Sequence, residues 1–123
     1  MRYSFEDLEV WQRAVQFATD VIRLVEKSFP EKGHYRLIEQ LESAATSIAM
    51  NIAEGKGRFS QKEFIQFLYI SRGSLYETVT LLEIMGRLGW IGKEACAKLR
   101  SESHEISKMI NGLISSLKKA RGS

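Results

Sequence analysis

The stretch Asn51-Ile52-Ala53-Glu54-Gly55-Lys56-Gly57-Arg58 is the most informative part of this chain of 123 residues. It has the form of a helix end, rich in small residues, that runs directly into a basic turn. Gly55 is expected to adopt the left-handed conformation that ends many helices, because glycine reaches positive φ without a steric penalty. A second stretch, Gly73-Ser74-Leu75-Tyr76-Glu77, puts small residues inside the next apolar-periodic segment. Neither stretch has the form of a catalytic motif.

Apolar residues recur at spacings of three and four in four segments of the chain, at 8–29, 38–52, 64–85 and 96–117. This period is that of an amphipathic helix that buries one face. No segment shows the period-two alternation that is typical of a strand. Four helices joined by short loops predict an all-α fold, an antiparallel up-down-up-down four-helix bundle, with residues 1–123 forming a single domain.

The first segment carries two adjacent apolar stripes. The heptad seam consists of Leu8, Trp11, Val15, Ala18, Ile22, Val25 and Phe29, and the second stripe of Val10, Ala14, Phe17, Val21 and Leu24. Two stripes cover more surface than a helix of a monomeric bundle usually buries. Either the bundle wraps this helix deeply or another subunit covers it, and the second alternative predicts a homo-oligomer.

Capping and breaking residues mark the helix boundaries. Ser4 is the expected N-cap of the first helix, and the Pro-Glu-Lys-Gly segment at 30–33 ends that helix. Ser60 and Glu63 form a Ser-x-x-Glu capping box, in which each side chain bonds the other residue's backbone amide. These signals predict where the first helix starts and stops and where the third begins.

Two further features concern helix packing. Gly73 lies inside the third helix, where glycine costs about 1 kcal/mol relative to alanine. Close packing of another helix over Ser71, Gly73 and Ser74 is the expected reason. Trp90 and Ile91, in the last turn, are expected to close one end of the bundle.

Composition bounds the class of protein. The formal net charge of +3 and the pI near 9.1 permit contact with nucleic acid without requiring it. Cys96 is the single cysteine, which fits a reducing compartment, and its place on an apolar seam predicts a buried structural thiol. The start of the chain lacks the apolar run of a signal peptide, and no apolar run approaches the ~20 residues of a membrane span. Cytoplasmic residence without a membrane partner is expected.

Catalytic and metal sites find little support in the sequence. Glu31 and His34 have the Glu-x-x-His spacing of ferritin-like metal ligands only once, in a loop, so no metal and no cofactor are expected. Asn51, Glu54, Ser74 and Glu77 are polar residues placed where helices meet. One interpretation makes Glu54 or Glu77 a general base. The favoured one is a structural polar network, because no second catalytic group is identifiable.

Basic residues form two candidate surfaces for nucleic acid. Lys56, Arg58 and Lys62 cluster at the junction of the second and third helices, although Arg58 could instead pair with Glu54 or Glu77. The last third of the chain is also biased toward positive charge. Its candidate contacts are Lys98, Arg100, Lys118 and Lys119. A solvated helix face would look much the same, so the basic bias alone does not decide.

The chain resembles the four-helix-bundle family of 23S rRNA intervening-sequence proteins, also called S23-type ribosomal proteins. This family includes the accessory variability protein of diversity-generating retroelements. The resemblance rests on the string at 51–58 and on further motifs over most of the chain. These are Phe5-x-x-Leu8-x-Val10-Trp11-x-x-Ala14, Phe29-Pro30, Tyr35-x-Leu37-x-x-Gln40-Leu41, Ser47-Ile48, Phe64-x-x-Phe67-Leu68 and Gly73-Ser74-Leu75-x-Glu77.

The resemblance implies a bundle that assembles as a ring, typically a homopentamer, without enzymatic activity. In the retroelement branch it implies binding of nucleic acid and of a reverse transcriptase. Two departures from the family pattern stand out. Glu42 and Ser43 occupy places where relatives often carry an Arg-Arg pair, which weakens a phosphate-binding surface on that face. Ala49 and Met50 stand where relatives often have proline, which favours a straighter second helix.

Taken together, the sequence predicts a non-enzymatic homo-oligomeric bundle that binds RNA or other nucleic acid through a composite basic surface. The alternative is a protein-interaction scaffold without a nucleic-acid role, which Glu42 and the modest net charge favour.

Overall fold

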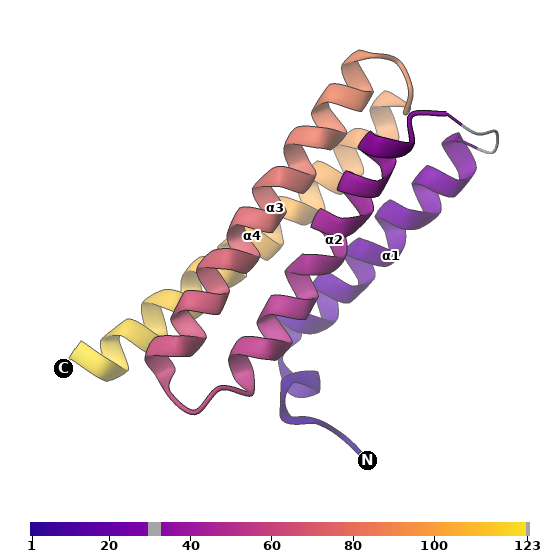
Figure 1. Cartoon of the computed structure of the whole chain (residues 1–123). Coiled ribbons are helices and arrows are strands. Elements are labelled where there is room, and N and C mark those ends of the chain that lie inside the picture. The colour runs from indigo at the N-terminus through magenta and orange to yellow at the C-terminus, as the bar shows by residue number, and fades with distance from the viewer. Residues whose placement is uncertain (30–32, 123) are drawn as a thin grey trace.

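The chain folds into four long helices that run side by side, antiparallel to their neighbours in sequence (Figure 1). The structure is a computed structural model that describes residues 1–29 and 33–122. A short 3-10 helix, Ser4–Asp7, precedes α1 (Glu9–Ser28), α2 (Tyr35–Lys56), α3 (Gln61–Arg87) and α4 (Lys93–Gly122). Each helix packs against the next in sequence, and α1 also packs against α4, which closes the bundle. The described residues contain no strand, and the predicted all-α four-helix bundle is confirmed.

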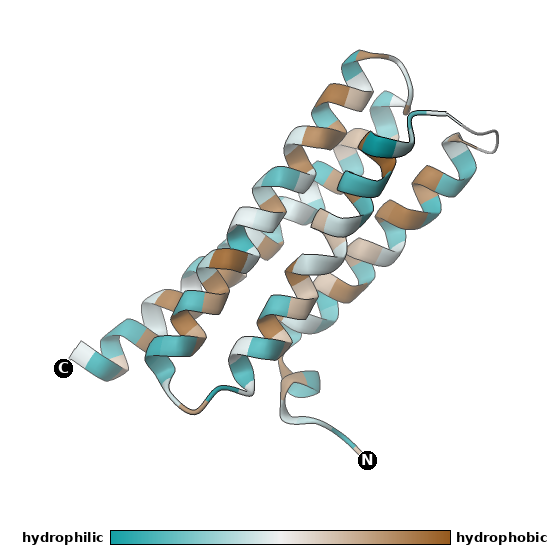
Figure 2. Ribbon diagram, viewed as in Figure 1, coloured by the Kyte–Doolittle hydropathy of each residue, from teal (hydrophilic) through white to brown (hydrophobic). Residues whose placement is uncertain are grey.

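The core lies along the axis of the bundle and is built from the inward faces of all four helices (Figure 2). Its largest fully buried apolar side chains are Phe17, Leu41, Ile48, Ile52, Leu68, Leu75, Met85, Ile106 and Ile110. Burying one such side chain contributes about 1.5–3 kcal/mol relative to leaving it exposed, so this interior is the main source of stability.

The two apolar stripes of α1 have different environments. The second stripe is the buried one, with Val10, Phe17 and Val21 inside the core. On the heptad seam, Val15 remains 37% exposed and Ile22 is only half-buried. The bundle therefore covers one stripe and leaves part of the other at the surface.

The start of α3 follows the sequence prediction. Ser60 is the N-cap, and its hydroxyl oxygen accepts a hydrogen bond from the backbone N–H of Glu63 at 3.2 Å. The Glu63 carboxylate accepts from the Ser60 hydroxyl, also at 3.2 Å, rather than from the backbone amide. The predicted cap is confirmed, with this one difference in the return bond.

The predicted cap at Ser4 is wrong. Ser4 lies inside the 3-10 helix, and α1 begins at Glu9 with Leu8 as its N-cap residue. The reason is local, because the Glu6 carboxylate accepts from the backbone N–H of Tyr3 at 2.7 Å and so stabilises a separate tight turn. The predicted break at 30–33 falls mostly outside the described residues.

Gly55 does not take the left-handed conformation expected of it. It is buried within the last turn of α2, and the C-cap residue Gly57 also has a negative φ, of −80°. A Cβ atom at Gly55 would lie 2.6 Å from Cβ of Phe67 and 2.9 Å from Cδ1 of Phe64. Glycine is therefore required for the close approach of α2 and α3. The glycine with positive φ is Gly89, at 77°, in the turn between α3 and α4.

The small residues near the middle of α3 divide between the two sides of the helix. Ser71 is buried and donates to the backbone carbonyl of Ile48 at 2.8 Å, and Ser74 meets Ser47 of α2. Gly73 is exposed, and a Cβ atom added there would meet nothing within 4 Å. The expected close packing is confirmed for the two serines and wrong for Gly73, because position 73 lies on the outward face of the helix.

The turn between α3 and α4 closes one end of the bundle, as predicted. Ile91 is buried, and Trp90 packs against the core. The Trp90 ring stacks on His34 with centroids 3.7 Å apart and meets the edge of Phe29 at 5.9 Å. Aromatic contacts thus join the ends of α1, α2 and α3.

The other end of the bundle contains the α2–α3 turn and both chain termini (Figure 1). With 30 residues, α4 is the longest helix, and in this view its last turns project past the start of α3. Its last buried residue is Ile114, so the final turns carry mostly exposed side chains. No helix in the described ranges is long and apolar enough to cross a membrane.

Candidate nucleic-acid interface

The α2–α3 turn presents three of the predicted basic residues at one end of the bundle. The Arg58 guanidinium lies 2.6 Å from a Glu54 carboxylate oxygen and 4.8 Å from the centroid of Phe67. The Lys56 ammonium lies 6.0 Å from the centroid of Phe64. Lys62 is exposed on the first turn of α3. Of the three, only Arg58 has its charge matched by a carboxylate within the described part of the chain.

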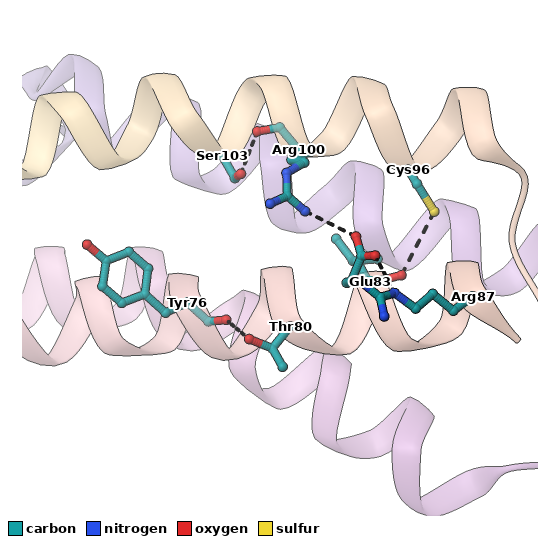
Figure 3. A network of polar contacts seen from close by, with 8 residues as sticks. Tyr76, Thr80, Glu83, Arg87, Cys96, Arg100 and Ser103 are labelled. Atoms are coloured by element: carbon teal, nitrogen blue, oxygen red, sulfur yellow. Dashed lines mark hydrogen bonds and ion pairs between the residues drawn. The ribbon is translucent and has the colours of Figure 1, made fainter.

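The predicted basic residues of α4 do not form a single surface. Lys98 lines a groove against α1, together with Asp20 and Glu102. Arg100 donates to Glu83 of α3 at 3.1 Å (Figure 3). Lys118 and Lys119 lie on the last turns, at the end of the bundle that also contains the α2–α3 turn. The structure therefore separates Lys98 and Arg100 from the other candidates.

Lys118 belongs to a cluster of cations and aromatic rings that spans α3 and α4. Its ammonium lies 5.2 Å from the ring centroid of Tyr69. The Arg72 guanidinium lies 4.9 Å from the same ring and 5.9 Å from that of Tyr76, and it donates to Asn111 Oδ1 at 2.8 Å. Arg72 is not among the nucleic-acid contacts predicted from the sequence. The signal was present, because positions 69, 72 and 76 are three, four and seven apart and share a helix face.

Of the predicted polar network, the structure joins Asn51 and Ser74 through Ser47. The Asn51 amide donates to the Ser47 carbonyl and hydroxyl oxygens, both at 2.8 Å, and the hydroxyls of Ser47 and Ser74 lie 2.8 Å apart. Glu54 lies outside this network, paired with Arg58. Glu77 also lies outside it, where it accepts from Gln40 of α2 at 3.2 Å.

Cys96 lies at the contact between α3 and α4, where it packs against the core but is only partly buried, less than predicted. Its sulfur lies 3.9 Å from the backbone carbonyl oxygen of Leu82 and packs against Gly86 (Figure 3). Burial raises the pKa of the Cys96 thiol, and the negative charge of Glu83 raises it further. A raised pKa keeps the thiol protonated and makes it a poor nucleophile at neutral pH.

Glu83 is the centre of an ion-pair network on the same face (Figure 3). It accepts from Arg87 at 2.8 Å and from Arg100 at 3.1 Å. The hydrogen bond and charge of Arg87, with the charge of Arg100, hold the pKa of the Glu83 carboxyl below its usual range. Within residues 1–29 and 33–122, no three His, Cys, Asp or Glu side chains are grouped so that they could hold a metal ion.

Comparison with known proteins identifies the family. The model of the family described as 23S rRNA-intervening sequence protein matches residues 6–112. A solved structure of a protein of unknown function from the S23 ribosomal protein family of Bacteroides thetaiotaomicron is also similar. It is 26% identical, with a TM-score of 0.76, and the match covers 85% of this chain and 97% of that one. A comparison with curated proteins gave no match. The fold, the motif at 51–58 and the family match agree, and the chain belongs to the 23S rRNA-intervening sequence protein family.

Proposed function

We propose that this protein is a non-enzymatic homo-oligomer that binds RNA through the end of the bundle where the α2–α3 turn and the last turns of α4 meet. One observation carries the proposal. Lys56, Lys62, Lys118 and Lys119 come from two segments far apart in sequence, yet they lie at this end, and none has a carboxylate partner among the described residues. Unmatched cations favour phosphate contacts, which supply most of the affinity of non-specific nucleic-acid binding.

The family name gives RNA priority over other polyanions, because it refers to 23S rRNA. Non-enzymatic action is supported by the positions of the two carboxylates that acid–base chemistry would use. Glu77 is bonded to Gln40, whereas Glu54 lies fourteen positions after Gln40 on the same helix, about 21 Å along its axis. Two groups so far apart do not act on one substrate bond. The single cysteine supports action in the cytoplasm.

Oligomerisation is supported by apolar side chains on two different faces. On α1 the partly exposed residues are Val15 and Ile22, and on α3 and its C-cap they are Ile70, Ile84 and Leu88. The two helices do not contact each other within the bundle. A ring needs two different complementary surfaces on each subunit, and these two faces meet that need. Five subunits is the number that the family resemblance implies.

Fluorescence anisotropy of labelled RNA across a salt series tests the RNA-binding function. Affinity should fall log-linearly with salt, with a slope of about −0.7 per phosphate contact for a single strand. The double variant Lys56→Glu/Lys62→Glu should bind about tenfold more weakly or worse, because two attractive contacts become repulsive. The matched control is Lys27→Glu/Lys93→Glu, which makes the same change of charge at the opposite end of the bundle.

Equal loss of affinity in both double variants would contradict the assignment to this end of the bundle. No binding at low salt would reject RNA as the ligand. It would favour the second candidate, a protein-interaction scaffold, which the exposed apolar pair Ile84 and Leu88 at the end of α3 supports. Light scattering tests the assembly separately, and a mass of 14.1 kDa at micromolar concentration would rule out the oligomer.

A further inference from the structure

An open groove runs between α3 and α4 on the face that carries Tyr76. Its volume is about 660 Å³, and it is lined on the α3 side by Tyr76, Val79 and Thr80. The α4 side provides small side chains, including Ala97, Ser101 and Ser107, and three larger groups, Arg100, His104 and Glu105. A volume of this size can admit a flat ring beside Tyr76.

Tyr76 forms one rim of this groove, and its ring is open to solvent except where the Arg72 guanidinium approaches it. It is 49% exposed, and in Figure 3 its ring is directed away from the Glu83 ion pairs. Its phenol hydroxyl makes no hydrogen bond within residues 1–29 and 33–122. The ring is distinguished from the other exposed aromatic rings by its place beside a groove, which suits a planar partner.

Two cations lie farther along the same face, and Arg72 is the nearer of them to Tyr76. Arg72 lies one helical turn before it, and Lys118 lies beyond Arg72, over Tyr69. Neither has a carboxylate within ion-pair distance in the described part of the chain. Arg72 is instead held by two rings and by Asn111, which fixes the guanidinium while leaving its charge unmatched.

The carboxylates nearest this groove are already paired. Glu83 is bonded to Arg87 and Arg100, and Glu105 lies 3.1 Å from Lys108. Their charges are largely offset at short range, so they oppose an anion at Arg72 and Lys118 only weakly. The face thus combines an exposed ring, an open groove and unmatched cations in a row.

We infer that this face binds single-stranded RNA, with a base stacked on Tyr76 in the α3–α4 groove and the adjoining phosphates on Arg72 and Lys118. This inference rests on the proposed RNA-binding function and adds a site to it. Single-stranded RNA is recognised by stacking of unpaired bases on aromatic side chains, whereas the bases of a duplex are not available to the ring. The hydroxyls of Ser101 and Ser107 on the opposite wall are suited to hydrogen bonding with the ribose 2′-OH or a base edge.

The test separates stacking from phosphate attraction. Four labelled probes of about 12 nucleotides are compared with the wild-type protein: oligoadenylate RNA, the same ribose-phosphate backbone without bases, an RNA duplex, and oligodeoxyadenylate. The protein should bind oligoadenylate RNA most tightly. Tyr76→Ala should weaken that binding about tenfold or more and leave the affinity for the abasic backbone unchanged. Tyr76→Phe should bind like the wild type, because the ring remains.

Further variants act as controls. Arg72→Ala should weaken both the base-containing and the abasic probe, since it removes a phosphate contact. Tyr35→Ala removes another exposed tyrosine, at the start of α2 and outside this groove, and should have no effect. Circular dichroism should show the same helicity for all variants, because Tyr76 lies at the surface.

Several outcomes would overturn the inference. Unchanged affinity of Tyr76→Ala for oligoadenylate would do so, and so would equal wild-type affinity for the abasic backbone or for the duplex. Equal binding of oligodeoxyadenylate would reject the preference for RNA. A change of oligomer mass in Tyr76→Ala would assign this face to subunit contact. If the wild type binds none of the probes at low salt, the proposed function fails as well, whereas tight binding to the abasic backbone leaves the proposed function standing.

Discussion

The hydroxyl oxygens of Ser47 and Ser74 lie 2.8 Å apart across the contact between α2 and α3. The same Ser47 oxygen also accepts from the Asn51 amide at 2.8 Å. Three polar side chains from two helices thus satisfy one another at this contact. This contact is partly buried, so its loss should be measurable as stability.

Ser47→Ala and Ser74→Ala should each destabilise the protein by about 1 kcal/mol, because a partly buried hydroxyl loses its partner. In a double-mutant cycle the two changes should couple by at least about 0.5 kcal/mol, since each removes the same hydrogen bond. Urea denaturation followed by circular dichroism measures both quantities. Glu77→Gln is the control on α3, because it lies outside this network; strict additivity of the serine changes would contradict the prediction.

Gly55→Ala should destabilise the protein by about 1–3 kcal/mol, although alanine is the better helix former. The new methyl group would lie 2.6 Å from Cβ of Phe67, an atom fixed to the α3 backbone, so the helices must move apart. Gly57→Ala is the matched control, because its Cβ would meet only backbone oxygens at 3.6 Å and beyond. Equal midpoints of denaturation for the two variants would show that α2 and α3 are less tightly packed than described.

Cys96 should react slowly with iodoacetamide in the native protein. Burial and the charge of Glu83 raise the pKa of the thiol, so the pH profile of the alkylation rate should lie at higher pH than in the urea-unfolded protein. As pH rises, the thiol ionises in the unfolded protein before it ionises in the folded protein. The contribution of Cys96 to stability is therefore complete below the unfolded pKa and is lost as pH rises through the folded pKa. Cys96→Ser should remove this alkaline loss, and coincident native and unfolded rate profiles would show that the fold does not raise the pKa of this thiol.

The ionised Glu83 carboxylate should stabilise the folded protein, and this stabilisation should be lost at acid pH. Arg87 and Arg100 lower the pKa of its carboxyl, so the contribution is present above the unfolded pKa and is lost as pH falls through the folded pKa. The effect should be small because the group is well exposed to solvent. Glu83→Gln should flatten the acid limb of the plot of melting temperature against pH, whereas Glu39→Gln, which removes an exposed carboxylate that makes no ion pair among the described residues, should leave it unchanged.

The features that the sequence predicted correctly are those encoded over short stretches. The Ser60 cap needs only Glu63, three residues on, and the inward placement of Leu41, Ile48 and Ile52 follows from the helical period. These features depend on residues that are close in sequence, and the fold class follows from them.

The features that the sequence did not predict depend on which face of a helix meets which neighbour. Gly55 and Gly73 are both glycines within helices, yet one lies under Phe67 and the other in open space. The same limit applied to the candidate interface. Arg100 and Lys118 both belong to the basic last third of the sequence. Only the structure shows that Arg100 pairs with Glu83 and that Lys118 lies over Tyr69.

The excess length of α4 has a thermodynamic consequence. Past Ile114 the helix has lost most of the packing that stabilises the rest of the bundle, so its last turns depend on intrinsic helix formation, which is marginal for short segments. Amide hydrogens there should exchange much faster than those near Ile106 and Ile110. A ligand held by Lys118 and Lys119 would slow that exchange, and part of its binding free energy would be consumed in ordering the helix end.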